Sequence, residues 1–274
     1  MGDLREHLLS KSQGDLLPWS EQQAAAEAYG VTVRQIEGAA LEAGLLPARY
    51  QRNRKTLSTA DQLKLFRSTV AVIGCGGLGG YVVEELARLG VGRLKAIDPD
   101  VFEEHNLNRQ LMSTMAALGK PKVEAAFDRV AQINPAVELV ALRERFSKQN
   151  GSTLLSGSDV AVDALDNIST RLELAEVCAS LGIPLIHGSI AGWYGQVVTQ
   201  FPGESTLQTL YGRCSDGVGV EKHLGNPSYT PAVIASLQVA EVCKVLLGRG
   251  RPIAGEMLVI NLLDMDFSKF KIKC

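Results

Sequence analysis

VAVIGCGGLGG, residues 70–80, decides the fold of this chain. An apolar run ends in Gly74, Gly76 and Gly77, and a helix is expected to begin at about Gly79–Tyr81. Apolar run, glycine-rich turn and helix together are typical of a βα nucleotide-binding unit. Glycines in the turn let backbone N–H groups approach a phosphate at the helix N-terminus, because no Cβ stands in the way.

A carboxylate and a dense polar cluster follow this unit. The apolar run Leu94–Ile97 ends on Asp98, and an acid about 20 residues after the glycines can hydrogen-bond a ribose hydroxyl. The stretch Asn106-Leu107-Asn108-Arg109-Gln110 comes directly afterwards. A redox dinucleotide fold does not require such a cluster, so the sequence favours another chemistry on a nucleotide.

Composition excludes several classes of protein. The 274 residues carry a net charge of −2, which argues against a general affinity for nucleic acid or anionic membrane. No apolar run approaches the roughly 20 residues that span a bilayer, and the N-terminus lacks the apolar core of a signal peptide. The cysteines are scattered, odd in number and never paired as CxxC, which favours reduced thiols in the cytoplasm and gives no zinc signature. They are Cys75, Cys178, Cys214, Cys243 and Cys274.

Alternating helical and strand patterns between residues 58 and 201 predict an α/β fold. We expect a Rossmann-like, mostly parallel sheet with helices on both faces. Gly203–Ser228 is rich in Gly, Ser and Asp and is expected to be a loop, which a compact domain of this size keeps for a functional flap or leaves disordered. Pro231–Leu247 is expected to be a buried helix, and two late strands are expected around Asp264.

Residues 1–48 are expected to form an N-terminal helical extension, with helices near 22–29 and 32–43. Residues 49–274 form the main domain, with a flexible crossover loop at about 203–229. The extension resembles a helix–turn–helix in outline. Its three basic and seven acidic residues give a net charge of −4, whereas reading DNA requires basic phosphate contacts. A packing or dimerisation arm is therefore the favoured role.

Six motifs in a fixed order resemble one family. They are GCGGLGG, DPDVFEEHNLNRQ, GKPKVEAA, INP, ALDN and GSIAGWYGQV. This set resembles the ThiF/MoeB/HesA adenylyltransferases, bacterial relatives of ubiquitin-activating enzymes, over about residues 49–270. The resemblance implies ATP-dependent adenylation of the C-terminal glycine carboxylate of a small ubiquitin-like protein. That partner is often a sulfur carrier for thiamine, molybdopterin or a related pathway. The demand on such a site is to hold a polyphosphate and offset its charge.

The resemblance also implies roles for individual residues. Backbone amides around Gly74, Gly76, Gly77 and Gly79 would line the phosphates, Asp98 would hold the ribose, and Asp100 would support Asp98 or the metal. Asn106, Arg109, Gln110 and Lys122 would contact the phosphates, Asp166 would lie near Mg²⁺ and the α-phosphate, and Arg52 would reach into the partner subunit's site of a homodimer. Each role has a plainer alternative, such as a solvated charge for Arg109 and Lys122 or a helix cap at Asp166-Asn167.

The chain departs from the family in its cysteines. Many members hold a structural zinc with two CxxC pairs, and four such ligands cannot be assembled here, so we expect no zinc site and side-chain packing in its place. Some members use a cysteine in the crossover loop for a covalent link with the carrier. Cys214, beside Arg213, is the cysteine of that loop here, and a lone loop cysteine is more often incidental. Cys178 and Cys243 are expected in the core. His187 and His223 have no partner cluster in the sequence and are given no ligand role.

Alternative functions remain open at this level. A relative that activates a small-molecule or tRNA carboxylate would share the same fold, an NAD-dependent oxidoreductase would share the glycine turn, and a non-catalytic regulator would share the nucleotide pocket. The favoured expectation is a cytoplasmic homodimer that uses ATP and Mg²⁺ and acts on a carrier ending in Gly-Gly, with no membrane partner and no nucleic acid.

Overall fold

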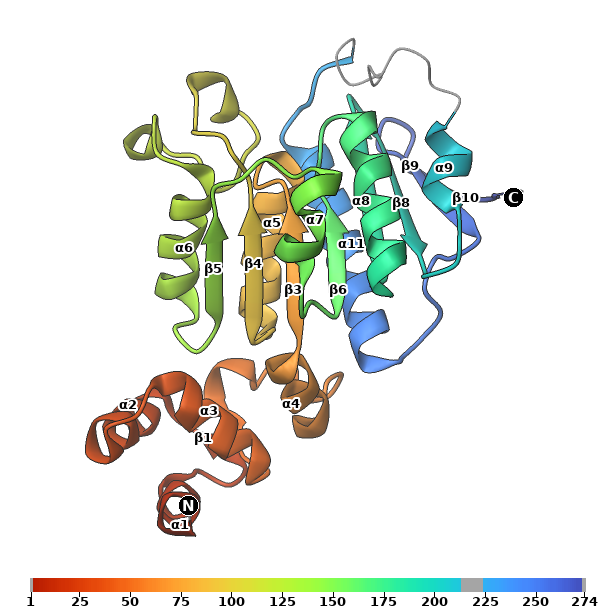
Figure 1. Ribbon diagram of the computed structural model, residues 1–274. Helices are drawn as coiled ribbons and strands as arrows, with labels where there is room; N and C mark the ends of the chain where they lie inside the picture. The colour runs from red at the N-terminus through yellow and green to blue at the C-terminus, as the bar shows by residue number, and fades with distance from the viewer. Residues whose placement is uncertain (1, 213–223, 273–274) are drawn as a thin grey trace.

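The computed structural model describes residues 2–212 and 224–272. Its centre is an eight-stranded sheet with the strand order β10-β9-β8-β7-β6-β3-β4-β5 (Figure 1). The parallel strands are β3 (Thr69–Ile73), β4 (Arg93–Ile97), β5 (Glu138–Leu142), β6 (Val160–Asp163) and β7 (Leu185–Ala191). Three antiparallel strands continue the sheet beyond β7: β8 (Tyr194–Gln200), β9 (Glu256–Asn261) and β10 (Asp266–Lys271). The expected α/β class with extra late strands is confirmed.

Neighbouring residues of each buried strand point to opposite sides of the sheet. Since these residues are apolar, both faces of the sheet are covered by helices. In β3, Val70 and Val72 belong to one core cluster, whereas Ala71 and Ile73 belong to another. The first cluster lies under α5 (Gly77–Leu89), α6 (Lys122–Ile133) and α11 (Tyr229–Leu247). The second lies under α7 (Lys148–Leu155), α8 (Ile168–Leu181) and α9 (Thr206–Tyr211).

Pairing in register brings the carboxyl ends of the central strands together. Ile73 at the end of β3 is the partner of both Ile97 in β4 and Asp163 in β6. The chain reverses into a loop or helix after each of these residues. Whatever follows β3, β4 and β6 is therefore gathered at one edge of the sheet, where ligands bind in open α/β sheets.

Helix α11 has the length and composition of a helix that could span a membrane. The helix has 19 residues and is long and apolar enough to cross a membrane by length and composition alone, and half of that window is buried inside the protein. The expectation that no apolar run approaches this length is thus too strict. In the structure α11 packs against α5, β7 and β8, as the core helix of a folded domain does.

The N-terminal helices form a unit with a core of its own. It comprises α1 (Gly2–Lys11), α2 (Trp19–Tyr29) and α3 (Val33–Glu42), with the short parallel pair β1 (Leu16–Leu17) and β2 (Leu46–Pro47). Helix α1 has no counterpart among the expected elements. The unit lies at the amino ends of the strands, opposite the edge described above (Figure 1). Helix η1 (Ala48–Tyr50) and α4 (Thr59–Arg67) connect it to β3.

The prediction of a loop over residues 203–228 is partly wrong. Residues 203–228 were expected to lack regular structure, yet Thr206–Tyr211 forms α9. Leu207 is buried, and Leu210 and Tyr211 pack against the cluster under α8. These three apolar residues recur at helical spacing, which the surrounding Ser, Thr and Gly conceal. Residues 213–223 lie outside the described residues.

Candidate active site

A pocket opens at the carboxyl ends of β3, β4 and β6. Its walls come from the turn after β3, the segment after β4, the loops after β5 and β6, and the residues before α11. Among its lining residues are Gly74, Gly76, Gly77, Asp98, Asp100, Arg109, Gln110, Lys122, Arg145, Asp166, Asn167, Arg171 and Asn226. The structure therefore brings together most of the residues that the sequence selected.

Two glycines of the turn are required by the protein's own packing. Gly74 has a φ of 96°, and a Cβ there would lie 2.5 Å from the carbonyl oxygen of Ala164. A Cβ on Gly79 would lie 1.8 Å from the carbonyl oxygen of Gly74. At Gly76, by contrast, a Cβ would meet only the side chain of Gln110, at 3.5 Å or more. Gly74 and Gly79 thus let α5 begin close against β3, and Gly76 faces the pocket with space in front of it.

Helix α5 begins at Gly77, two residues earlier than the range expected from the sequence. The first N–H groups of a helix have no partner inside it, and the helix dipole favours negative charge there. Since Gly76 and Gly77 line the pocket, its floor is suited to a phosphate.

Asp98 is buried below this floor, with 5% of its surface exposed. Its Oδ2 accepts a hydrogen bond from the backbone N–H of Cys75 at 2.7 Å, and its Oδ1 accepts one from the N–H of Asp100 at 2.8 Å. Burial raises the pKa of the Asp98 carboxyl, against the opposing attraction of the Lys122 ammonium. The carboxylate fixes the glycine turn relative to β4, and it remains part of the pocket wall.

Lys122 and Asp100 form an ion pair at the same wall. The Lys122 Nζ lies 3.2 Å from Asp100 Oδ2, and the lysine side chain is 9% exposed whereas the aspartate is 56% exposed. The backbone N–H of Lys122 also donates to the carbonyl of Asp100 at 3.0 Å. Lys122 begins α6, so helix and ion pair together hold a buried ammonium at the pocket.

Arg109 and Gln110 follow the short helix η2 (Glu104–Asn106). The Arg109 Nη1 donates to the carbonyl of His105 at 3.0 Å and to Asn108 Oδ1 at 2.9 Å. Burial lowers the pKa of Arg109, and the attraction of Asp166 opposes that shift. Among the described residues, Gln110 Oε1 is buried without a hydrogen-bond partner. A buried oxygen of this kind at a pocket wall is open to a ligand.

Asp166 lies in the loop between β6 and α8. It is exposed, and its Oδ1 accepts a long hydrogen bond of 3.5 Å from the Asn167 side chain. The helix cap belongs to Asn167, whose Oδ1 accepts from the N–H of Thr170 at 2.9 Å. The alternative of Asp166 as the cap of α8 is therefore wrong, and its carboxylate is open to the pocket.

Among the described residues, three that the sequence selected do not line this pocket: Gly79, Asn106 and Arg52. Asn106 is buried, and its Oδ1 accepts from the N–H of Glu103 at 3.0 Å, so it caps η2 and does not line the pocket. Arg52 is exposed in the turn after η1, away from the lining residues of its own chain. Cys214 lies outside the described residues, as do His223 and Cys274.

Comparison with known protein families identifies the family of this chain. The model of the ThiF family matches residues 50–274. This chain belongs to the ThiF family.

Two relatives carry the similarity further. The chain is 36% identical over 208 residues to the "SAMP-activating enzyme E1" of Haloferax volcanii, covering 75% of this chain and 77% of that protein. It is 36% identical over 223 residues to the "Sulfur carrier protein adenylyltransferase" of Thermus thermophilus, covering 77% of this chain and 81% of that protein. The ThiF family and the adenylyltransferases among its relatives support adenylyltransferase activity, a chemistry that uses ATP.

Among solved structures, the crystal structure of E. coli MccB with ATP superposes with a TM-score of 0.68. It is 18% identical and covers 98% of this chain and 87% of that one. At this identity the likeness shows the fold alone.

Three features of the pocket in this ThiF-family chain fit a nucleoside triphosphate. Gly76 leaves space at the helix N-terminus, Gln110 offers an unpartnered buried oxygen, and Lys122 and Arg109 supply positive charge. In residues 2–212 and 224–272, no group of three His, Cys, Asp or Glu side chains could hold a metal ion. Burial raises the pKa of the Cys178 thiol to about 12 and that of Cys243 to about 11, which suits the core positions expected for both.

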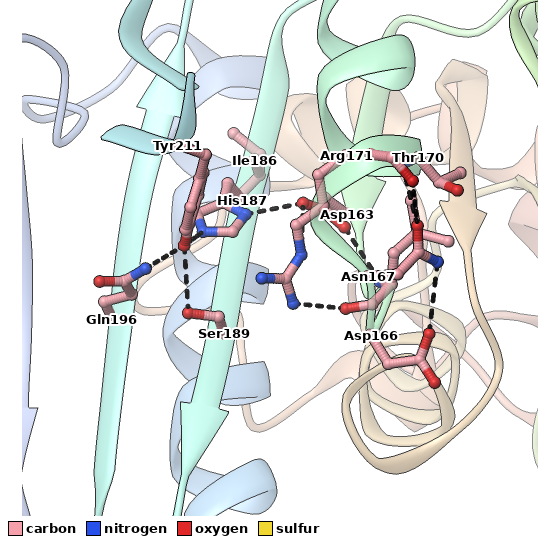
Figure 2. A network of polar contacts seen from close by, with 12 residues as sticks. Asp163, Asp166, Asn167, Thr170, Arg171, Ile186, His187, Ser189, Gln196 and Tyr211 are labelled. Carbon is pink, nitrogen blue, oxygen red and sulfur yellow. Dashed lines mark hydrogen bonds and ion pairs between the residues drawn. The ribbon is translucent and has the colours of Figure 1, made fainter. Parts of the chain in front are cut away.

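Sequence reasoning missed one cluster beside the pocket of this ThiF-family chain. His187 was expected to have no partners, but its Nδ1 lies 2.7 Å from Asp163 Oδ2 and its Nε2 lies 3.0 Å from the hydroxyl of Tyr211 (Figure 2). That expectation is wrong. Arg171, which lines the pocket, also joins the cluster. No local spacing announces these contacts, because each partner comes from a different strand or helix.

Proposed function

We propose that this protein is an ATP-dependent adenylyltransferase that activates the C-terminal glycine carboxylate of a small ubiquitin-like sulfur carrier. The observation that carries the proposal is one pocket in which Arg109, Lys122 and the N-terminus of α5 surround the same space. The names of the two relatives, one SAMP-activating and one acting on a sulfur carrier protein, support the choice of substrate.

The chemistry asks for charge and position, with no need of a strong base. A carboxylate oxygen of the carrier forms a bond to the α-phosphorus of ATP while the bond from that phosphorus to the bridging oxygen breaks. The products are an acyl-adenylate and pyrophosphate, which carries away the electron pair. Arg109 and Lys122 offset the charge on the phosphates, and fixed cations of this kind stabilise the transition state without reorganising. The backbone of the glycine turn orients the triphosphate.

The proposed reaction also involves Mg²⁺ and a partner subunit. Asp166, an exposed carboxylate at the pocket, would hold Mg²⁺, whose preferred ligands are oxygens, and the ion would supply further charge to the phosphates. Arg52, exposed and remote from its own pocket, would serve the site of the partner subunit in a homodimer. We also propose a cytoplasmic enzyme with no membrane or nucleic-acid partner, working in thiamine, molybdopterin or related cofactor synthesis.

Pyrophosphate–ATP exchange with candidate carriers tests the proposal. We expect exchange that requires a small carrier ending in Gly-Gly, and none with the same carrier shortened by its last two residues, because the carboxylate then fails to reach the pocket. Exchange with a small carboxylic acid in place of the carrier would assign the enzyme to another substrate class. ATP binding without any exchange would indicate a regulator, and preference for NAD over ATP would overturn the proposal.

A further inference from the structure

A chain of hydrogen bonds joins α9, through the buried His187, to the end of β6. The Tyr211 hydroxyl, at the end of α9, lies 3.0 Å from His187 Nε2 in β7, and His187 Nδ1 lies 2.7 Å from Asp163 Oδ2 (Figure 2). Asp163 and His187 are each 0% exposed. Gln196 also donates to the Tyr211 hydroxyl from β8. The chain thus ties a short helix to the centre of the sheet.

The direction of each hydrogen bond follows from the protonation of the ring. Burial lowers the pKa of His187, although the hydrogen bond and charge of Asp163 oppose that shift. A neutral ring that donates from Nδ1 to a carboxylate must accept at Nε2. The Tyr211 O–H therefore donates to His187 and accepts from Gln196, so every polar group along this line has a partner.

Both ends of this cluster act on the backbone of one residue, Leu165. Asp163 Oδ1 accepts from the N–H of Leu165 at 2.9 Å. Arg171 Nη2 donates to the carbonyl of Leu165 at 2.5 Å, and its guanidinium lies 5.8 Å from the centre of the Tyr211 ring. Arg171 Nε is also 3.7 Å from Asp163 Oδ2. The residue held from both sides is the one directly before Asp166.

We propose that His187 and Tyr211 are positioning residues that hold the loop of Asp166 in its place at the pocket. The inference rests on the role proposed for Asp166. Within the part of the chain that the structure describes, the Asp166 side chain forms one long hydrogen bond, to Asn167, so it does little to fix its own position. The rigidity of its backbone comes instead from Leu165, Asp163 and Arg171. The Tyr211 hydroxyl keeps His187 on Asp163, and the Tyr211 ring keeps Arg171 beside Leu165.

The first test measures hydrogen exchange of the Leu165 amide in the whole protein without ligands. Tyr211→Phe removes the hydroxyl and leaves the ring, and His187→Asn keeps a donor for Asp163 while losing the atom that faces Tyr211. We expect each variant to speed exchange at Leu165 about fivefold, because the opening of this loop becomes easier. The two changes break the same link, so the double variant is expected to be no faster than either single one.

Tyr50→Phe is the matched control. Tyr50 is also a hydrogen-bonded phenol, although it is 1% exposed whereas Tyr211 is half-buried. Its oxygen is hydrogen-bonded to Glu37 and Asn134, and it lies at the opposite end of the sheet. We expect it to lower the melting temperature at least as much as Tyr211→Phe and to leave Leu165 exchange unchanged. Equal acceleration in the control, additive effects in the double variant, or unchanged exchange in both Tyr211→Phe and His187→Asn would each overturn the inference.

The second test measures carrier-dependent pyrophosphate exchange in the same variants. We expect kcat to fall about tenfold in Tyr211→Phe, with the KM for ATP within about twofold of the native value, because a small displacement of a positioned group costs rate more than binding. Tyr50→Phe should keep the native kcat. An unchanged kcat in Tyr211→Phe would contradict the inference. If the native protein shows no exchange, the proposed function fails, and the Leu165 amide still decides the structural link.

Discussion

Two hydrogen-bonded tyrosines occupy opposite ends of the same sheet, Tyr50 buried and Tyr211 half-buried. Tyr50, at the amino end, donates to Glu37 Oε1 at 2.8 Å and accepts from Asn134 Nδ2 at 2.8 Å. Tyr211, at the carboxyl end, exchanges hydrogen bonds with His187 and Gln196. Both hydroxyls are paired, as polar groups inside a folded protein usually are. What differs is the neighbour one step further on.

The hydrogen-bond partners of Tyr50 lie where the N-terminal helices contact the domain that contains the sheet. Glu37 belongs to α3, Asn134 follows α6, and Arg34 reaches from α3 to the carbonyls of Gly92 and Ala136. None of these residues lines the pocket. Beyond Tyr211 lies Arg171, which does. Similar chemistry therefore contributes stability at one end of the sheet and the geometry of a reaction site at the other.

The largest expected effect is a loss of activity without a loss of stability, in variants at the carboxyl end of the sheet. Arg109→Ala and Asp166→Ala should each lower pyrophosphate exchange about a thousandfold or more, because a fixed charge is removed where phosphate charge develops. Neither side chain forms an ion pair within the described residues, and their hydrogen bonds are local. We therefore expect melting temperatures within about 2 °C of the native value. Activity would be measured by exchange and stability by thermal unfolding.

Arg54→Ala provides the matched control for charge removal. Arg54 is an exposed arginine that pairs with Asp15 at 3.0 Å in the N-terminal unit. Its loss should change neither exchange nor melting temperature, since exposed pairs contribute little. Full exchange in Arg109→Ala or in Asp166→Ala would show that the role assigned to that residue is wrong.

The same contrast explains which features the sequence could predict. Asp98 was predictable because a ribose acid stands about 20 residues after a glycine turn, a distance that the intervening helix and strand set. Lys122 was selected from the resemblance to the family. The partners of His187 obey no such spacing. Asp163 and Tyr211 each lie 24 residues away, on β6 and α9, and only the strand order brings them together. Helix α9 escaped prediction for a related reason, because its burial comes from contact with α8 and hardly from its own composition.

The second prediction addresses the amino end. Asn134 is 1% exposed, and its Nδ2 donates to the Tyr50 hydroxyl and to the carbonyl of Ala87, each at 2.8 Å. Its Oδ1 accepts from Arg49. Asn134→Ala removes one hydrogen-bond partner from each of these groups at a buried position, so we expect the free energy of unfolding to fall by about 2–3 kcal/mol. Denaturant unfolding measures the loss, and kcat for exchange at 25 °C should remain native.

A fall in kcat in folded Asn134→Ala protein would break the comparison, because it would show that the amino end also shapes the pocket. Ser10→Ala serves as the control for a lost hydrogen bond of small consequence. The Ser10 hydroxyl donates to the carbonyl of His7 within α1 and is exposed, so its removal should change the free energy of unfolding by less than about 0.5 kcal/mol.

The smallest effect concerns pH and sharpens the comparison at the carboxyl end. Because burial lowers the pKa of His187, the folded protein keeps the ring neutral at pH values where the unfolded chain protonates it. Unfolding then takes up a proton below about pH 6.5, the ordinary pKa of histidine. The stability due to this group is present above that pH and is lost as pH falls toward the folded-state pKa. Its contribution is at most about 1.4 kcal/mol per pH unit.

His187→Asn isolates this contribution, since asparagine does not titrate. Every other ionisable group is common to the two proteins, so the difference between their unfolding free energies cancels them. We expect the native protein to lose stability more steeply than the variant between about pH 6.5 and 5.5. Parallel curves would mean that His187 accepts a proton in the folded state. The Tyr211 hydroxyl would then lose its acceptor at Nε2, and the link from α9 to Asp163 would weaken in acid together with the loop it holds.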